Sequence, residues 1–152
     1  MRRTISFFGH RSLWEKDLRK RLKAVVESKV CDELHCLIGT HGDFDELALS
    51  VCRELRRTYP HIKISVVFTS LSIFQNVKGE TYSMADDYED VETTTYEIEE
   101  EYFKKRIIVS NKKMIDESDL VICYVNMNKC NSGARIAVNY AMKQGKEVIN
   151  IF

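Results

Sequence analysis

The feature that most constrains the fold of this chain is a regular alternation between short apolar segments and longer segments with helical periodicity. The apolar segments span only four to seven residues and are rich in β-branched and aromatic side chains, which predicts strands. Between them, apolar residues recur every three or four positions, as in an amphipathic helix. The predicted strands are residues 4–8, 34–38, 62–68, 120–125 and 148–151, and the predicted helices lie near 14–25, 44–55, 105–116 and 133–144.

Strands that alternate with helices favour a parallel sheet covered on both faces, with right-handed crossovers. We therefore expect an α/β, doubly wound, Rossmann-like domain over residues 1–152, with a mostly parallel five-stranded sheet and helices on both faces. The length of 152 residues suits one such domain. Because the chain has neither an apolar run long enough to span a bilayer nor a signal-peptide pattern, we expect a cytoplasmic protein with no membrane partner.

Local signals mark where helices begin and end. Ser12 and Glu15 have the spacing of a capping box before the first helix. Asp43 is the expected N-cap of the second helix. Gly145 follows the last helix, where a glycine often ends a helix.

An acidic insertion interrupts the alternation at about residues 70–104, after the third predicted strand. Residues 80–101 within it carry ten acidic side chains and no Lys or Arg. This composition is typical of a solvated surface segment, and the alternatives are a lid over the ligand or a dimer contact. Basic residues of the first helix could face the insertion in the same or a second chain, namely Arg19, Lys20, Arg21 and Lys23.

Three glycine-containing loops follow predicted strands and lead into predicted helices. In an open parallel sheet the ligand crevice lies beyond the carboxyl ends of the strands, where the strand order reverses. Free N–H groups and the dipole at a helix N-terminus favour an anion such as phosphate. The candidate ligand-binding residues are Gly9, His10, Arg11, Gly39, Thr40, His41, Gly42, Asp43, Asp45, Ser132, Gly133 and Arg135.

The roles of individual loop residues follow from their chemistry. Arg11 offers a planar, two-pronged donor for phosphate or carboxylate, and Asp45 in the first turn of a helix suits sugar hydroxyls. The structural alternatives are a tight turn with an exposed Arg11, and simple helix caps at Asp43 and Ser132. The loops lack both the P-loop pattern and the G-x-G-x-x-G pattern, so neither a Walker site nor ordinary nicotinamide dinucleotide binding is indicated.

Several other classes of site have little support. His10, His41, Asp43 and Asp45 could be combined into a metal site, but loop histidines and helix-start carboxylates have ordinary structural roles, so we predict no metal. The five cysteines show no C-x-x-C spacing and are expected to be reduced and mostly buried. Because the net charge is zero and basic residues cluster only on the first helix, nucleic acid is not expected as a partner.

The three loops in this order resemble the SLOG superfamily, the Rossmann-like domains related to the DNA-processing protein DprA and to the lysine-decarboxylase-like cytokinin-activating enzymes. Short, stand-alone YpsA-like members are the most similar. The segments that carry the resemblance are 8–11, 39–45, 118–124, 132–134 and 141–149.

The resemblance implies a domain that binds a nucleotide or nucleotide-derived ligand, such as an ADP-ribose-like molecule, as a sensor, sequestering or regulatory protein, with pairing into homodimers. No cofactor is firmly implied. Hydrolytic relatives carry a catalytic Glu where this chain has Ala137, and Lys129, Cys130 and Asn131 replace their Pro-Gly-Gly. Enzymatic activity therefore stays open. One alternative is an N-glycosidic-bond hydrolase or transferase that uses Asp43, Asp45 or a carboxylate of the insertion as acid or base. The other alternative is a protein-interaction module.

Overall fold

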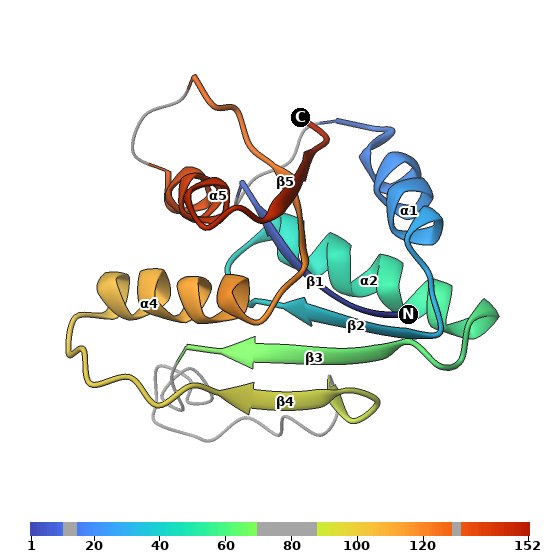
Figure 1. The fold of residues 1–152 in the computed structure, drawn as a ribbon, viewed down its shortest axis with the longest axis horizontal. Helices are drawn as coiled ribbons and strands as arrows, with labels where there is room; N and C mark the ends of the chain where they lie inside the picture. The colour runs from blue at the N-terminus through green and yellow to red at the C-terminus, as the bar shows by residue number, and fades with distance from the viewer. Residues whose placement is uncertain (11–14, 70–87, 129–131) are drawn as a thin grey trace.

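The computed structural model describes residues 1–10, 15–69, 88–128 and 132–152 (Figure 1). Its strands are β1 (Arg2–Gly9), β2 (Glu33–Ile38), β3 (Lys63–Phe68), β4 (Glu92–Thr95), β5 (Leu120–Tyr124) and β6 (Glu147–Asn150). Its helices are α1 (Leu18–Ser28), α2 (Asp43–Thr58), α4 (Phe103–Asp116) and α5 (Gly133–Lys143).

The strands form one sheet in the order β4-β3-β2-β1-β5-β6, and every neighbouring pair is parallel. The predicted doubly wound α/β class is confirmed, but the sheet has six strands rather than five. The additional strand is β4, which lies inside the predicted acidic insertion and pairs with β3 at the sheet edge. Its sequence, Glu-Thr-Thr-Thr, is polar because an edge strand need not bury its side chains, and so it lacks the apolar pattern of the other strands.

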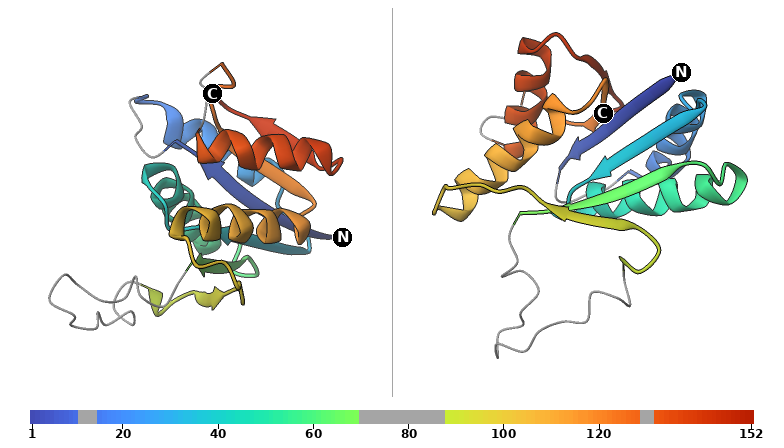
Figure 2. Two further views of the ribbon diagram at one scale, coloured as in Figure 1. Left: turned by 90° about the vertical axis from the view of Figure 1, so that its left-hand side faces the viewer. Right: turned by 60° about the horizontal axis from the view of Figure 1, so that its bottom comes forward.

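Alternate residues of β1 contribute to two cores on opposite faces of the sheet. Figure 2 shows the two helix layers, with α1 and α2 on one face of the sheet and α4 and α5 on the other. Phe7 belongs to the core that contains Leu22 of α1 and Phe44 of α2, and all three are fully buried. Phe8 belongs to the core that contains Met114 of α4 and residues of α5. Each such buried side chain contributes about 1.5–3 kcal/mol through removal from water. The period of two along β1 thus separates an α1–α2 layer from an α4–α5 layer.

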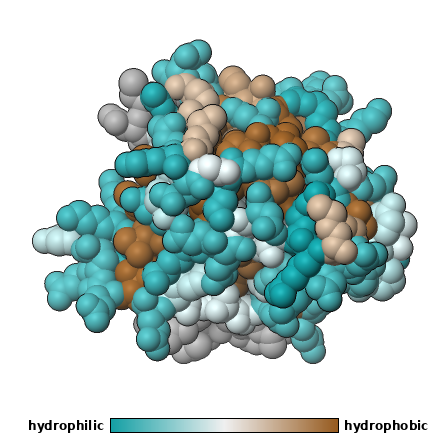
Figure 3. Space-filling model, in the orientation of Figure 1, coloured by the Kyte–Doolittle hydropathy of each residue, from teal (hydrophilic) through white to brown (hydrophobic). Residues whose placement is uncertain are grey.

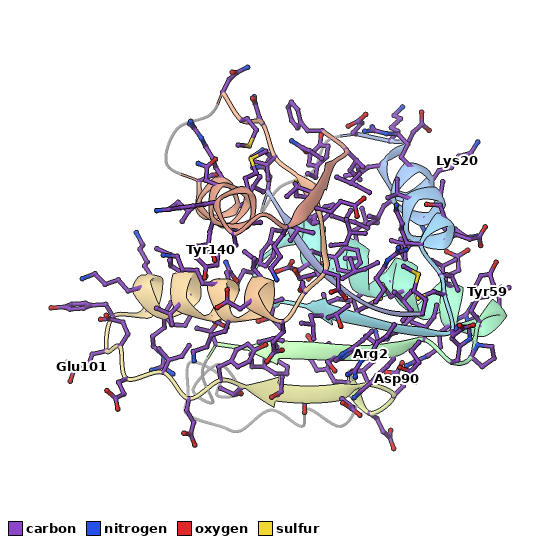
Figure 4. All side chains as sticks on the ribbon, viewed as in Figure 1. Arg2, Lys20, Tyr59, Asp90, Glu101 and Tyr140 are labelled. Carbon is purple, nitrogen blue, oxygen red and sulfur yellow. The ribbon has the colours of Figure 1, made fainter. Side chains whose placement is uncertain are left out.

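Polar contacts join the two helices of the α4–α5 layer. Tyr140 lies on the side of α5 that faces α4 (Figure 4), and its hydroxyl donates to Asp116 Oδ1 at 2.7 Å. The Nζ atom of Lys112 lies 5.2 Å from the centroid of the Tyr140 ring, within the range of a cation–π contact. These contacts hold the C-terminal part of α4 against α5.

Helix α1 begins later than the sequence pattern predicts. Its first residue is Leu18, and Glu15 precedes the helix, so Glu15 cannot serve as the N3 residue of a capping box. The carboxylate of Glu15 instead accepts hydrogen bonds from Arg21 and from the Tyr124 hydroxyl, the latter at 3.0 Å. Ser12 lies outside the described residues. The capping-box prediction is therefore wrong, because a tertiary contact holds Glu15.

Among the described residues, glycines with positive φ stand at one helix start and one helix end. Gly42, with φ of +129°, is the N-cap of α2, and Asp43 is the first helical residue. The prediction that Asp43 caps α2 is therefore wrong by one position. Asp43 still lies in the first turn, where the helix dipole favours a carboxylate. Gly145, with φ of +72°, follows α5 as predicted.

In the described part of the acidic insertion, Asp90 contacts α2. Arg53 donates two hydrogen bonds to Asp90, at 3.1 and 2.8 Å, and Arg56 also binds this carboxylate. On α1, Arg19 and Lys23 both bind Glu54 of α2. These two α1 cations thus pair with a carboxylate of α2, and no ion pair joins α1 to the insertion within the described residues. The hypothesis that basic residues of α1 face the insertion stays a prediction.

The described cysteines fit the expectation of reduced, mostly buried thiols. Cys36, Cys52 and Cys123 are buried, Cys31 is half-buried, and all four are free. Cys130 lies outside the described residues. Burial raises the pKa of the Cys123 thiol to about 12, which makes it a poor nucleophile at neutral pH.

The surface seen in Figure 3 is mostly hydrophilic, with hydrophobic side chains exposed in its upper half and at one place on its left. Among the helices in the described part of the chain, none is long and apolar enough to cross a membrane.

Candidate functional site

A cavity of about 730 Å³ lies at the carboxyl ends of the strands. Its lining includes the end of β1 and the end of β5, which are neighbours in the sheet. The chain leaves β1 through β2, β3 and β4 on one side and returns to β5 and β6 on the other, so the strand order reverses at β1. The cavity therefore occupies the position predicted for an open parallel sheet.

Gly9 brings helix α2 into direct contact with the end of β1. A Cβ atom on Gly9 would lie 2.3 Å from Phe44 Cγ and 2.6 Å from Phe44 Cβ, far inside van der Waals contact. The Phe44 ring in turn stacks on Tyr124, with centroids 6.3 Å apart and planes inclined by 15°. The absence of a side chain at Gly9 thus allows Phe44 of α2 to pack directly against the end of β1 beside the cavity.

His10 is held in one orientation by the backbone of the β5 loop. Its backbone N–H donates to the Tyr124 carbonyl at 3.2 Å, and its ring Nε2 accepts from the Asn126 N–H at 2.8 Å. The ring meets Tyr124 and Phe152 edge-on, with centroids 6.0 Å away in each case. Since Nε2 is an acceptor here, a neutral His10 ring carries its proton on Nδ1.

The loop after β2 brings His41 and Asp45 together on the α2 side of the cavity. The backbone N–H of His41 donates to Asp45 Oδ2 at 2.7 Å, and His41 Nε2 lies 2.6 Å from Thr69 Oγ1. A Cβ on Gly39 would lie only 3.0 Å from the same Asp45 oxygen. Burial raises the pKa of Asp45 to about 6, although the His41 N–H opposes this shift.

Arg106 of α4 braces this corner of the site from outside the cavity. Its guanidinium donates to the backbone carbonyls of Ile98 and Glu100, at 2.8 and 2.9 Å, and to the carbonyl of Thr69 at 3.2 Å. Thr69 is the residue whose hydroxyl holds His41. The segment before α4 is therefore tied to the loop after β3.

The third glycine loop places the N-terminus of α5 at the cavity. The side chain of Ser132 accepts from the Arg135 N–H at 3.0 Å, so Ser132 is a true N-cap. Ser132, Gly133 and Ala134 all line the cavity, and no atom lies within 4 Å of a Cβ built on Gly133. A helix N-terminus that opens on a cavity is a suitable site for an anion.

Helix α4 supplies a wall that the sequence reasoning missed. Lys104, Ile107, Ile108 and Asn111 line the cavity, at the i, i+3, i+4, i+7 spacing of one helix face. This spacing is visible in the sequence, but only the fold shows that it faces this cavity. Phe152 was missed as well, and it is 58% exposed at the cavity.

The structure brings seven of the predicted residues to the cavity, namely Gly9, His10, Gly39, His41, Asp45, Ser132 and Gly133. Four do not line it, namely Thr40, Gly42, Asp43 and Arg135. Gly42 caps α2, Asp43 is exposed, and Thr40 Oγ1 is buried with no hydrogen-bond partner among the residues described. Arg11 lies outside the described residues. The ligand-binding role of all these residues stays a prediction.

No group of three or more His, Cys, Asp or Glu side chains is placed to hold a metal ion in residues 1–10, 15–69, 88–128 and 132–152. Asp43 is exposed at the start of α2, whereas His10, His41 and Asp45 line the cavity.

No protein-family model matches the chain, and no curated protein sequence matches it. Solved structures of DNA processing protein A (DprA) are similar. DprA from Streptococcus pneumoniae has a TM-score of 0.68 at 20% sequence identity, over 97% of this chain and 49% of that chain. A structure describing the single-stranded DNA binding mode of DprA from Helicobacter pylori has a TM-score of 0.63 at 16% identity, over 95% of this chain and 63% of that chain.

The chain thus spans about half of the S. pneumoniae protein and under two thirds of the H. pylori protein. The Rossmann-like fold of DprA, which the sequence resemblance implies, is confirmed, whereas the YpsA-like assignment stays a prediction.

The expectation that nucleic acid is not a partner is wrong. The structure of H. pylori DprA describes single-stranded DNA binding by a protein of similar fold. Net charge is a sum over the whole chain, so an acidic insertion cancels basic residues elsewhere without removing their local field. A net charge of zero therefore gives no ground for exclusion.

Proposed function

We propose that the cavity binds a phosphorylated nucleoside or a related ligand such as ADP-ribose. One observation carries this proposal: the capped N-terminus of α5 and the carboxylate of Asp45 line one cavity from opposite layers of the fold. The volume of about 730 Å³ falls within the range of small-molecule sites, about 300–1,000 Å³.

The cavity offers groups suited to the phosphate, the sugar and the base of such a ligand. Phosphate oxygens accept from the N–H groups at Gly133 and Ala134 and from the ammonium group of Lys104. Sugar hydroxyls donate to the carboxylate of Asp45, for which His41 is the hydrogen-bond partner. The base lies on apolar surface such as that of Phe152.

Binding without cleavage is favoured by the residue at position 137. Ala137 is 2% exposed in the α4–α5 core and offers no carboxylate where hydrolytic relatives carry their Glu. Asp45, with a pKa of about 6, is the remaining candidate for acid or base chemistry, so the test of binding includes a measurement of base release.

The experiment compares two lysines in one helical turn. Lys104 lines the cavity, whereas Lys105 is exposed over the Tyr102 ring, so Lys104→Gln and Lys105→Gln carry the same change of charge. Calorimetric titration with AMP and ADP-ribose should give affinities about fivefold or more weaker for Lys104→Gln, because it loses a charge-assisted contact. Lys105→Gln should match the wild type, and chromatography should show no free adenine.

Two results would refute the proposal. One is a wild-type protein that no phosphorylated nucleoside stabilises in thermal unfolding. The other is an equal effect of the two lysine substitutions, which would point to long-range electrostatics rather than to contact in the cavity. Release of adenine would instead convert the binding proposal into the hydrolase alternative.

A second candidate function is binding of single-stranded DNA, favoured by the likeness to H. pylori DprA. Fluorescence anisotropy with a labelled oligonucleotide tests it, and the slope of affinity against salt concentration reports how many phosphates are contacted. Competition by AMP would show that the strand enters the same cavity. An affinity below detection at low salt would remove this candidate.

A further inference from the structure

Arg106 is a half-buried cation whose hydrogen bonds go to main-chain oxygen atoms. It donates to the carbonyls of Ile98, Glu100 and Thr69, and within the described residues it makes no ion pair. Its Nε is buried with no partner among the same residues. Burial of a cation and loss of its side-chain freedom both oppose folding, so this arrangement is costly.

The contact with Thr69 continues into the cavity. The carbonyl of the buried Thr69 accepts from Arg106 at 3.2 Å, and its hydroxyl lies 2.6 Å from His41 Nε2. The N–H of His41 then donates to Asp45 Oδ2 at 2.7 Å. Three hydrogen bonds in series therefore connect Arg106 to the carboxylate on the cavity wall.

The same helical turn contributes to the cavity directly. Lys104 and Ile107 flank Arg106 and both line the cavity. The ring of Phe103 meets His41 edge-on, with centroids 6.4 Å apart. Because Arg106 also binds the carbonyls of Ile98 and Glu100, it fixes the start of α4 relative to the loop that carries His41.

We infer that Arg106 is a positioning residue for the ligand: acting through Thr69 and His41, it sets the orientation of the Asp45 carboxylate without touching the ligand. This inference rests on the proposed function, and specifically on Asp45 as the acceptor for sugar hydroxyls. It predicts that Arg106 controls how well the site distinguishes a ribonucleotide from a 2′-deoxyribonucleotide. Binding of phosphate at the α5 N-terminus does not depend on Arg106.

The test measures the dissociation constants of AMP and 2′-deoxy-AMP by calorimetry. We expect the wild type to prefer AMP about tenfold, the effect of one hydrogen bond to a charged group. Arg106→Ala should lose most of this preference, while 2′-deoxy-AMP binds both proteins equally. Arg106→Lys, which keeps a donor on a long side chain, should restore part of the preference. Arg19→Ala, which removes a guanidinium that binds Ser50 and Glu54 of α2 and does not line the cavity, is the matched control and should leave the preference unchanged.

A second variant separates the relay from a general loss of stability. Thr69→Val removes the hydroxyl that His41 contacts but keeps the carbonyl that Arg106 binds. It should reduce the preference for AMP as much as Arg106→Ala does, and the double variant should be no worse than either single variant, as expected for residues acting in series. An additive double variant, or an unchanged preference in folded Arg106→Ala, would overturn the inference.

A measurement without ligand keeps this test distinct from that of the proposed function. Hydrogen exchange of the His41 amide reports its bond to Asp45, and we expect faster exchange in Arg106→Ala and Thr69→Val but not in Arg19→Ala. If no nucleotide binds the wild type, the proposed function fails, and the inferred role of Arg106 in ligand binding fails with it. If nucleotides bind and His41 exchange is unchanged, the relay alone fails.

Discussion

Replacement of Gly9 by alanine tests the packing of Phe44 against the end of β1. The new Cβ would lie 2.3 Å from Phe44 Cγ, whereas carbon atoms in contact are ordinarily about 3.5–4.0 Å apart. The Phe44 ring is fully buried and stacks on Tyr124, so it has little room to move. Removing this clash therefore requires a shift of β1 against α2. We expect the loss of stability to lie at the upper end of the usual overpacking cost of about 1–3 kcal/mol.

Thermal unfolding gives the measurement. For a chain of this size, about 1 kcal/mol corresponds to about 2–4 °C in Tm, so Gly9→Ala should lower Tm by about 6–12 °C. Gly133→Ala is the control, because nothing lies within 4 Å of its Cβ and the residue is helical. It should be neutral or stabilising by up to about 1 kcal/mol.

The comparison is decisive because both changes add one methyl group to a cavity-lining glycine. A Tm for Gly9→Ala within 1–2 °C of the wild type, on the scale of about 2–4 °C per kcal/mol, would refute the argument that Phe44 requires glycine at this position. Phe44→Ala would not rescue the variant, since Phe44 Cβ itself lies 2.6 Å from the new atom.

Three further predictions concern other residues of the site and its supports. The pKa of Asp45 in the folded protein, about 6, lies above its ordinary value of 3.8, so the free energy of unfolding falls as pH rises from 4 to 7 and Asp45 ionises. Urea titrations should therefore show that Asp45→Asn gains stability relative to the wild type over that range. Ser132→Ala should lose about 1 kcal/mol with its helix cap, as seen by calorimetry. Gly145→Ala, at φ of +72°, should lose about 1–2 kcal/mol, and an unchanged Tm would contradict the left-handed conformation.

The buried strands could be predicted because their sequences carry the physical reason for their burial. Residues 120–124 are apolar at every position, since β5 lies between two strands with helices over both faces. β4 could not be predicted in the same way. It is held by backbone hydrogen bonds to β3, which any polar sequence can make, and by contacts of Glu92 with Lys63 and Ser65 of β3.

The lining of the cavity could be predicted to a similar extent and for a similar reason. Residues that stop a strand and start a helix, such as Gly9 and Ser132, have local signatures, and both reach the cavity. Glu15 has the same kind of signature but is held by the hydroxyl of Tyr124, far away in the sequence. Residues such as Lys104 enter the site only through the packing of α4, which no local pattern specifies.

The separation of the two cores has a consequence for how this cavity can change over time. The half of the cavity that holds Asp45 belongs to α2 and packs with Phe44, whereas the half at the start of α5 packs with Ala141 on the other face of the sheet. Substitutions in one layer leave the packing of the other largely untouched. Selection can therefore change the chemistry of the α5 half while the α2 half is inherited unchanged, so that the cavity is altered one half at a time.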